Sequence, residues 1–334
     1  VEKIIQEKNF KKILPNDKNE WINQSSNLFK NYKVLGSREK VSDIKIFKDY
    51  TQGVLTSRDQ WCINFDKIKL MNNVDKLVTN YNKLVDDKKN EKITKENLNK
   101  HINFDASDFN WSRNFKNYFI NKKKIKTSNK NIRKVLYRPF TLKWIYYDKY
   151  LNELRYRVPK ILPDENSENL IISVMGSGES KEFSCLMHNH IPEFKTLYNG
   201  QHFPLYTYQN NETDSHENLL TNITEKNIKQ NNITEEIIIY LKKFYKQDLQ
   251  YKQLFFYIYG VLHAEDYRSL FKNNLNKEIP RIPYVKNFKD FIEIEKIGKS
   301  LSSLHLNFLD VNKHSINIKF SNRSNIKDKD LYKV

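Results

Sequence analysis

The chain has 334 residues, of which 58 are Lys or Arg and 40 are Asp or Glu, so its formal net charge is +18 at pH 7. Hydrophobic residues make up 38% and aromatic residues 13%, which excludes a disordered chain and is enough for a buried core. No apolar run is long enough to span a membrane. The two cysteines, Cys62 and Cys185, are too few for a disulfide scaffold or a four-cysteine zinc site.

The excess of basic residues is typical of proteins that bind a polyanion, and nucleic acid is the first candidate. The alternative explanation is compositional, because abundant Lys, Asn and Ile are also typical of an AT-rich genome. The basic residues are densest between Lys116 and Arg138. That stretch predicts either a surface that follows phosphates or a solvated linker.

The first part of the chain predicts two strands followed by helices. Residues 44–66 predict strand, tight turn and strand, with the turn at 53–59 and Cys62 buried in the second strand. Residues 67–86 carry apolar side chains at helical spacing, and residues 111–119 predict an amphipathic helix. The polar residues 87–103 between them predict a loop or a short helix.

The middle of the chain predicts short strands, and the end predicts helices. Turn signals separate the strand-like runs, which are residues 140–147, 170–175, 183–187 and 203–208. An Asn-rich polar break follows and predicts a mobile loop. Helical patterns then cover residues from Thr234, the expected N-cap, to 306, with a break at Pro280 and Pro283. The pattern as a whole predicts an α+β fold.

The helical patterns at the C-terminal end each have an expected apolar face. The first comprises Ile237, Ile238, Leu241 and Phe244, and the last comprises Phe291, Ile294, Ile297, Leu301 and Leu304. Between them, the aromatic residues Phe255, Phe256, Tyr257 and Tyr259 are expected in the core rather than as stacking platforms for bases.

A glycine-rich string at residues 175–178 resembles the loop by which methyltransferases hold S-adenosylmethionine. The acidic residue expected ahead of such a loop is missing, because Ser173-Val174 stands there. The sequence also has no Asn/Asp-Pro-Pro-aromatic tetrapeptide, no phosphate-binding Gly-x-x-x-x-Gly-Lys loop and no Gly-x-Ser-x-Gly elbow. A plain β-turn is the preferred interpretation of 175–178.

Two further patterns suggest metal chemistry. Asp164, Glu179 and Lys181 follow the carboxylate–carboxylate–lysine order of many Mg²⁺-dependent nucleases, although the Glu-x-Lys part lies in a polar turn rather than in an apolar strand. His188 and His190 could share one face of a strand and bind a metal, but no third ligand lies near them in the sequence. We therefore expect no metal site and keep an independent nuclease as an alternative.

Seven strings, taken in order, resemble one known family. They are Trp21 to Gln24; Gly53 to Trp61; Tyr137-Arg138-Pro139-Phe140 with Trp144 to Asp148; Phe203 to Tyr206; Tyr259 to His263 with Tyr267-Arg268; Pro280 to Tyr284; and Gly298 to Leu306. Together they resemble the C-terminal region of single-chain bacterial restriction-modification enzymes, the type ISP class and related fused restriction/N6-adenine methyltransferase proteins. The resemblance covers about residues 15–310.

The resemblance implies a function that explains the missing catalytic motifs. In that family nuclease and methyltransferase domains come first, with a helicase-like translocase in type ISP, and the target recognition domain comes last. The chain is then expected to begin within a longer polypeptide, consistent with Val1 in place of an initiator Met. Its implied partners are double-stranded DNA and the N-terminal methyltransferase domain of the same polypeptide, with no membrane. It would hold no cofactor, whereas the parent enzyme would use S-adenosylmethionine and Mg²⁺ in the bacterial cytoplasm.

The implied organisation divides the chain into five parts. Residues 1–134 form a connector, 135–208 a β-rich target recognition region, 209–233 a flexible loop, 234–310 a helical region and 311–334 a tail. The mixed β region for target recognition is expected to pack with the C-terminal helical region.

Candidate DNA-binding residues follow from their charge, their amides and their position near turns. They are Arg58, Lys122, Lys123, Lys124, Arg133, Arg138, Arg155, Arg157, Lys181, Asn189 and Gln201. For Arg138 the alternative is a structural pair with a carboxylate, and for Arg58 it is a local ion pair that fixes the turn. No residue is assigned a catalytic or metal-binding role. The prediction is sequence-specific recognition of double-stranded DNA; besides the nuclease, the other alternative is a basic scaffold without sequence preference.

Overall fold

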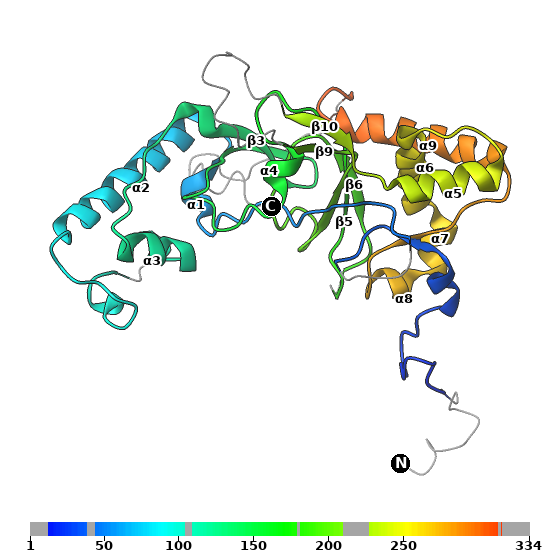
Figure 1. The fold of residues 1–334 in the computed structure, drawn as a ribbon, viewed down its shortest axis with the longest axis horizontal. Coiled ribbons are helices and arrows are strands. Elements are labelled where there is room, and N and C mark those ends of the chain that lie inside the picture. Colours follow the sequence, from blue (N-terminus) through cyan, green and yellow to red (C-terminus); the bar gives the residue numbers. More distant parts are fainter. Residues whose placement is uncertain are drawn as a thin grey trace, which may run out of the picture.

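The computed structural model describes residues 13–38, 44–103, 109–178, 181–209, 227–312 and 315. The molecule is elongated, with helices at both ends and strands between them (Figure 1). One end holds α2 (Lys67–Asp87) and α3 (Arg113–Ile120), which we call the helical lobe. The other end holds α5 (Glu235–Tyr245), α6 (Tyr251–His263) and α9 (Phe288–Leu306). The α+β class expected from the sequence is confirmed.

Shorter helices connect these elements. In the described residues they are α1 (Asp59–Cys62), α4 (Val158–Ile161), α7 (Glu265–Leu270) and α8 (Lys272–Leu275), with 3-10 turns at Asn27–Asn31, Leu98–Lys100 and Asn129–Asn131. No helix of the described residues is long and apolar enough to cross a membrane.

The described strands form small sheets. The four-stranded sheet has the order β2-β4-β3-β7, from β2 (Ile63–Asn64), β3 (Ile132–Arg138), β4 (Thr141–Tyr146) and β7 (Ile191–Pro192). The three-stranded sheet has the order β6-β5-β8, from β5 (Ile171–Val174), β6 (Cys185–His188) and β8 (Gln201–Pro204). Two strand pairs complete the set: β1 (Lys33–Val34) with β11 (Arg281–Ile282), and β9 (Tyr206–Gln209) with β10 (Ile228–Asn231). The pairs are antiparallel except β3 with β7.

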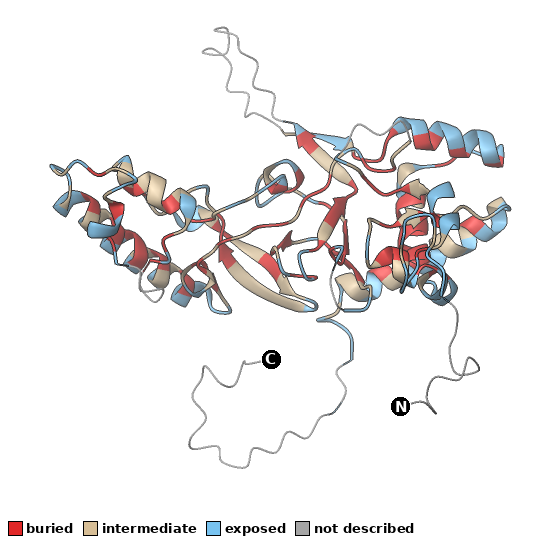
Figure 2. Ribbon diagram, turned by 90° about the horizontal axis from the view of Figure 1, so that it is seen from below, coloured by how far each residue is buried: buried red, intermediate tan, exposed pale blue. Residues whose placement is uncertain are grey.

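Separate buried clusters lie at the two ends of the molecule (Figure 2). In the helical lobe, α2 buries Leu70, Val74, Leu77, Val78, Tyr81 and Val85, which pack with Phe115 and Phe119 of α3. At the other end α6 is buried from Leu254 to Leu262 and packs with the three-stranded sheet. The expected core aromatics Phe255, Phe256, Tyr257 and Tyr259 are therefore confirmed.

Helices α6 and α9 approach so closely that glycine is required at their crossing. A Cβ on Gly298 would lie 2.1 Å from the carbonyl oxygen of Phe256, and one on Gly260 would lie 2.7 Å from that of Ile294. Next to the crossing, the rings of Tyr257 and Phe291 stack with centroids 4.2 Å apart. The crossing orients α9 so that Phe291, Gly298 and Ser302 are its buried residues.

The expected helical faces need three corrections. Ile297 is 64% and Leu304 58% exposed, because the buried face of α9 runs through Phe291, Gly298 and Ser302. Phe244 of α5 is 46% exposed, and the neighbouring Tyr245 is buried in its place. The helix bounds themselves lie close to those expected.

Other expectations for single segments also differ from the structure. Trp61 and Cys62 lie in α1, so the expected second strand is reduced to β2; burial of Cys62 is confirmed. Strand β10 occupies part of the segment expected as a loop, 209–233. Strand β3 occupies the last part of the basic stretch. The hydroxyl of the N-cap residue Thr234 donates to the carbonyl of Lys45 instead of accepting from the helix.

Candidate nucleic-acid interface

The β3–β4 hairpin carries both apolar and basic residues on each of its two faces. On one face Ile132 pairs with Tyr146, and Lys134 pairs with Trp144. Because successive side chains point to opposite faces, these four lie on the same side of the sheet. Ile132 and Tyr146 are buried against the helical lobe, whereas Lys134 and Trp144 remain partly exposed. The sheet thus presents a lysine and an indole at the edge of the lobe.

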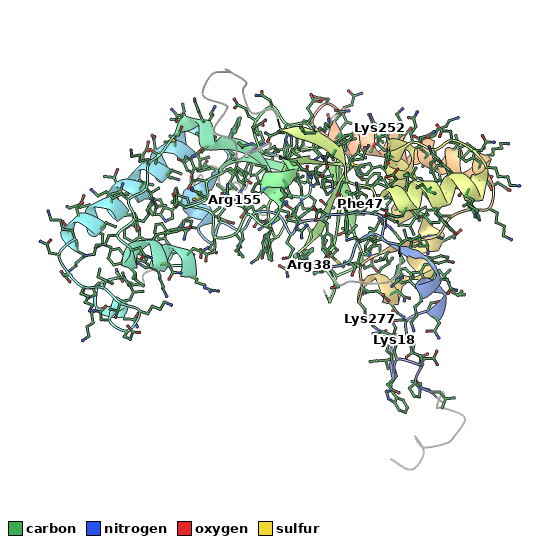
Figure 3. All side chains as sticks on the ribbon, viewed as in Figure 1. Lys18, Arg38, Phe47, Arg155, Lys252 and Lys277 are labelled. Atoms are coloured by element: carbon green, nitrogen blue, oxygen red, sulfur yellow. The ribbon has the colours of Figure 1, made fainter. Side chains whose placement is uncertain are left out.

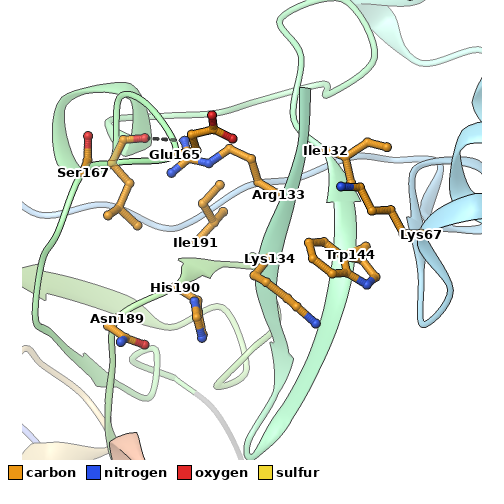
Figure 4. A pocket seen from close by; sticks show the side chains of 11 residues that line it. Lys67, Ile132, Arg133, Lys134, Trp144, Glu165, Ser167, Asn189, His190 and Ile191 are labelled. Atoms are coloured by element: carbon orange, nitrogen blue, oxygen red, sulfur yellow. Dashed lines mark hydrogen bonds between the residues drawn. The ribbon is translucent and has the colours of Figure 1, made fainter. Parts of the chain in front are cut away.

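A first hollow of about 370 Å³ lies over this pair (Figure 4). The Nζ of Lys134 is 3.9 Å from the centroid of the Trp144 ring, and the Nζ of Lys67 is 5.4 Å from it. Lys67 is the first residue of α2, where the side chain of Asp66 caps the helix by accepting from the backbone N–H of Lys69. Asn189 and His190 line the hollow from the turn between β6 and β7. Two cations therefore lie over one indole in a concave site.

A second hollow of about 540 Å³ lies next to the first and shares Arg133 and Glu165 with it. Arg133 and Arg155 both lie over Tyr147, with Cζ atoms 5.5 and 5.4 Å from the ring centroid. Arg133 also donates to the carbonyl oxygens of Leu162, at 2.7 Å, and Asp164, at 2.6 Å. Burial raises the pKa of Tyr147 to about 12, so its phenol stays neutral between the two guanidinium groups.

The two hollows have an excess of positive charge. Their basic residues, which we call the basic tract, are Lys67, Lys130, Arg133, Lys134, Lys149 and Arg155, and their acidic residues are Asp148, Asp164 and Glu165. Burial and the charge of Lys134 lower the pKa of His190, which favours its neutral form. A concave surface with this charge excess attracts phosphates.

The structure brings together three of the sequence-predicted site residues. Arg133 and Arg155 belong to the basic tract, and Asn189 lines the first hollow as an exposed side chain. The other candidates lie elsewhere, and most of them have partners within the protein.

Arg58 is 2% exposed and is held by the protein itself. Its guanidinium donates to the carbonyl of Leu151 at 2.6 Å and to the hydroxyl of Ser112 at 2.7 Å, and its Cζ lies 4.4 Å from the centroid of the Phe115 ring. These contacts fix the local structure, but through a carbonyl and a hydroxyl oxygen instead of the expected ion pair.

Arg138 forms the expected carboxylate pair. Its Nη1 lies 2.6 Å from Oε2 of Glu193, whose side chain is only 3% exposed. Burial raises the pKa of Glu193, while the guanidinium of Arg138 opposes that shift. The carboxylate pair of Arg138 is therefore confirmed; its own side chain is 38% exposed, and DNA binding by Arg138 stays a prediction.

The remaining candidates are distributed over the surface. Lys122 donates to the carbonyls of Lys88 and Glu91 after the end of α2, Lys124 pairs with Asp86, and Arg157 pairs with Asp49. Lys123 and Lys181 are exposed, and Gln201 is half-buried in β8. For these residues DNA binding stays a prediction.

Several residues of the two hollows were not among the DNA-binding candidates named from the sequence. These are Lys67, Trp144, Lys134, His190, Lys130 and Lys149, although Lys130 and Lys134 lie in the basic stretch for which a surface that follows phosphates was one of two predictions. The signal that could have found Lys134 and Trp144 is the period of two along β3 and β4, which places them opposite each other. Lys67 had no such signal, because only the fold brings the start of α2 to this sheet.

The structure gives no support to metal chemistry in the described residues. Asp164 accepts from the hydroxyl of Ser167, the backbone of Asn166 and the amide of Asn227, so its carboxylate serves a turn. Glu179 lies outside the described residues. The described residues contain no group of three or more His, Cys, Asp or Glu side chains that could hold a metal ion.

Residues 45–333 match the family model of the Type ISP C-terminal specificity domain. The chain belongs to this family. The resemblance seen in the seven strings is thereby confirmed, and the turn at 175–178, where Gly178 has a φ of 84°, is one of the turns of a specificity domain. No curated protein matches the chain.

Solved structures similar to this specificity domain include DNA complexes. A nuclease-deletion mutant of the Type ISP restriction-modification enzyme LlaGI, in complex with a DNA substrate mimic, has a TM-score of 0.73 and 30% identity over 89% of this chain and 21% of that chain. The ATP-dependent Type ISP restriction-modification enzyme LlaBIII bound to DNA has a TM-score of 0.74 and 30% identity over 90% of this chain and 18% of that chain. The DrdV–DNA complex has a TM-score of 0.77 and 26% identity over 96% of this chain and 30% of that chain. The specificity domain thus spans less than a third of each of these proteins.

Proposed function

We propose that this specificity domain recognises a particular sequence in double-stranded DNA and that the duplex lies along the basic tract. The observation that carries the proposal is the pair of adjacent hollows with six basic residues, in a chain of the Type ISP specificity family. Lysine and arginine bind phosphates and set the register of a protein on the duplex, whereas sequence is read by side chains that reach base edges. Residues 135–208 form the reading region in our proposal; they supply most of the lining of the two hollows but only Lys149 and Arg155 of the basic tract.

The wider setting is also a proposal. The domain would act beside an N6-adenine methyltransferase domain of the same polypeptide, and the complete enzyme would methylate its target and cut unmodified DNA in the bacterial cytoplasm. S-adenosylmethionine and Mg²⁺ would be bound by that preceding part. Support comes from the solved enzymes of which this domain matches only a fraction.

The test is binding of the full chain to a pool of random-sequence duplexes at about 50 and 200 mM salt, followed by sequencing of the retained DNA. Each phosphate neutralised adds about 0.9 to the slope of log affinity against log salt, so six contacts predict a loss of about 10³-fold over this range. We expect steep salt dependence and enrichment of one short motif.

Two other outcomes would favour the alternatives. Steep salt dependence without an enriched motif would favour a basic scaffold that has no sequence preference. Cleavage of the duplexes in the presence of Mg²⁺, abolished by Glu179→Ala, would favour an independent nuclease. Absence of binding at about 50 mM salt would contradict the proposal.

A further inference from the structure

The turn between β6 and β7 reaches the first hollow with two polar side chains. Asn189 and His190 form this turn, and both line the hollow together with Lys134 (Figure 4). Asn189 is exposed, whereas the neighbouring His188 is buried. The turn therefore presents an uncharged amide beside two lysines.

The turn is held from inside the protein by a buried hydrogen-bond network. Nδ1 of His188 lies 2.9 Å from the carbonyl oxygen of His190, so it carries the proton and donates. Nε2 of the neutral ring then accepts from the hydroxyl of Ser173 at 2.6 Å, and Ser173 Oγ accepts from Nδ1 of His202 at 2.5 Å. Burial lowers the pKa of both rings, which favours these neutral forms. The backbone of the turn is thus pinned to the three-stranded sheet.

The side chains around the hollow differ in what they can recognise. A lysine ammonium only donates and suits a phosphate oxygen, whereas an asparagine amide both donates and accepts and matches N6 and N7 of adenine. The ammonium groups of Lys67 and Lys134 lie over the ring of Trp144, which limits their freedom before any ligand binds. Asn189 lies on a turn that projects into solvent and is fixed at its base, as a reading side chain requires.

We propose that Asn189 is a base-reading residue of the specificity domain and that Lys67 and Lys134, in the same hollow, hold phosphates of the duplex being read. This inference rests on the proposed function and deepens it, because it assigns different tasks to neighbouring side chains. The favoured base is adenine, from the chemistry of the amide.

The two tasks can be separated by two readouts in one experiment. The full chain and its variants Asn189→Ala, Lys67→Gln and Lys134→Gln are each given the random duplex pool, and the enriched motif and the salt slope are measured for each. Asn189→Ala is expected to lose preference at one position of the motif, by about 5- to 150-fold, with the salt slope unchanged. Each lysine variant is expected to keep the motif, bind all duplexes more weakly and lower the salt slope by about 1.

Matched controls come from exposed residues far from the hollow. Asn90→Ala, after the end of α2, and Lys252→Gln, on α6, are expected to change neither readout. Figure 3 shows Lys252 at the end of the molecule that holds α6 and α9, and Arg155 of the basic tract nearer the middle. Asn189 is exposed, so thermal unfolding of Asn189→Ala should match that of the unmodified chain.

The outcomes that overturn the inference are distinct from those that overturn the proposed function. If the unmodified chain enriches a motif that survives Asn189→Ala unchanged, Asn189 does not read bases and the proposed function stands. If the lysine variants lower the salt slope no more than Lys252→Gln, the phosphate assignment is wrong. If the unmodified chain enriches no motif, the proposed function fails, and base reading by Asn189 fails with it.

Discussion

The crossing of α6 with α9 and the basic tract differ in how tightly they are packed and in the side chains that they use. At the crossing, two glycines allow backbones to touch, and stacked rings such as Tyr257 and Phe291 fill the space beside them. In the basic tract, long charged side chains lie over Trp144 and Tyr147 and leave two hollows open. The first region has no room for an added atom, whereas the second keeps room for a ligand. We therefore expect substitutions to cost stability in the first region and affinity in the second.

The largest expected effect is at the crossing. Gly298→Ala places a Cβ 2.1 Å from the carbonyl oxygen of Phe256, and because that atom is backbone the helices must separate. We expect a loss of about 3 kcal/mol or more in the free energy of unfolding, measured by urea denaturation. Ser300→Ala, an exposed neighbour on α9, is the control and should be neutral. Equal stability of the two variants would contradict the close packing.

Arg58 tests whether a buried cation belongs to the fold or to the DNA surface. Arg58→Lys removes the two-armed donor that reaches Leu151 and Ser112, so we expect a loss of about 2 kcal/mol in the free energy of unfolding. The salt slope of DNA binding should stay unchanged in the folded variant. Arg157→Lys, at a partly exposed pair with Asp49, is the control and should lose less than about 0.5 kcal/mol. A lowered salt slope with full stability would assign Arg58 to DNA.

The buried histidines predict acid sensitivity. Burial lowers the pKa of His202 from 6.5 to about 3 in the folded chain, so below pH 6.5 the unfolded chain binds the proton that the folded chain excludes. Stability is therefore retained above pH 6.5 and falls as the pH drops below it, by about 2 kcal/mol for His202 at pH 5. His188 adds to the fall in the same direction. Urea denaturation at several pH values measures this fall in the free energy of unfolding. A free energy of unfolding that stays constant from pH 6.5 to 5 would contradict burial of neutral histidine rings.

The smallest expected effect is at Lys124, and it tests whether DNA contacts the helical lobe as well as the basic tract. Lys124 and Asp86 form a pair in which both side chains are more than half exposed, at 56% and 53%. Lys124→Gln should change the free energy of unfolding by less than about 0.5 kcal/mol, because solvent screens the pair. If DNA follows the tract, this variant also leaves the salt slope unchanged, whereas Lys134→Gln lowers it. A lowered slope for Lys124→Gln would extend the DNA surface onto the lobe.

The sequence predicted where helices begin and end better than which of their faces are buried. The helix expected at the C-terminal end matches α9 because its helical pattern is long, but Ile297 and Leu304 are exposed. Apolar periodicity assumes that large side chains make the contact, and here Gly298 makes it. Which face of α9 is buried depends on where α6 passes, about forty residues earlier in the chain.

The candidate site was predicted in part for a similar reason. Arg133, Arg155 and Asn189 were found because charge and turn position are visible along the chain, and Arg138 was correctly given a carboxylate as its alternative partner. The dense run of lysines predicted either a surface that follows phosphates or a solvated linker. The structure divides it between the end of α2, where Lys122 binds carbonyls, and β3. Lys67 joins Lys134 only through tertiary packing, which no local pattern contains.

The pairing of β1 with β11 has a consequence for biosynthesis and for the exchange of domains between enzymes. Lys33 pairs with Ile282, and Phe29, Leu35 and Phe47 share a core with residues of α6 and α9. An emerging chain must hold its first strand unpaired until almost all of the domain has been synthesised, which is the signature of slow, non-local folding. A chimera that replaces only the reading region must preserve the pairing of β1 with β11. A transferable unit would run from before Phe29 to the end of α9, so new specificities are expected to move between such enzymes as whole domains.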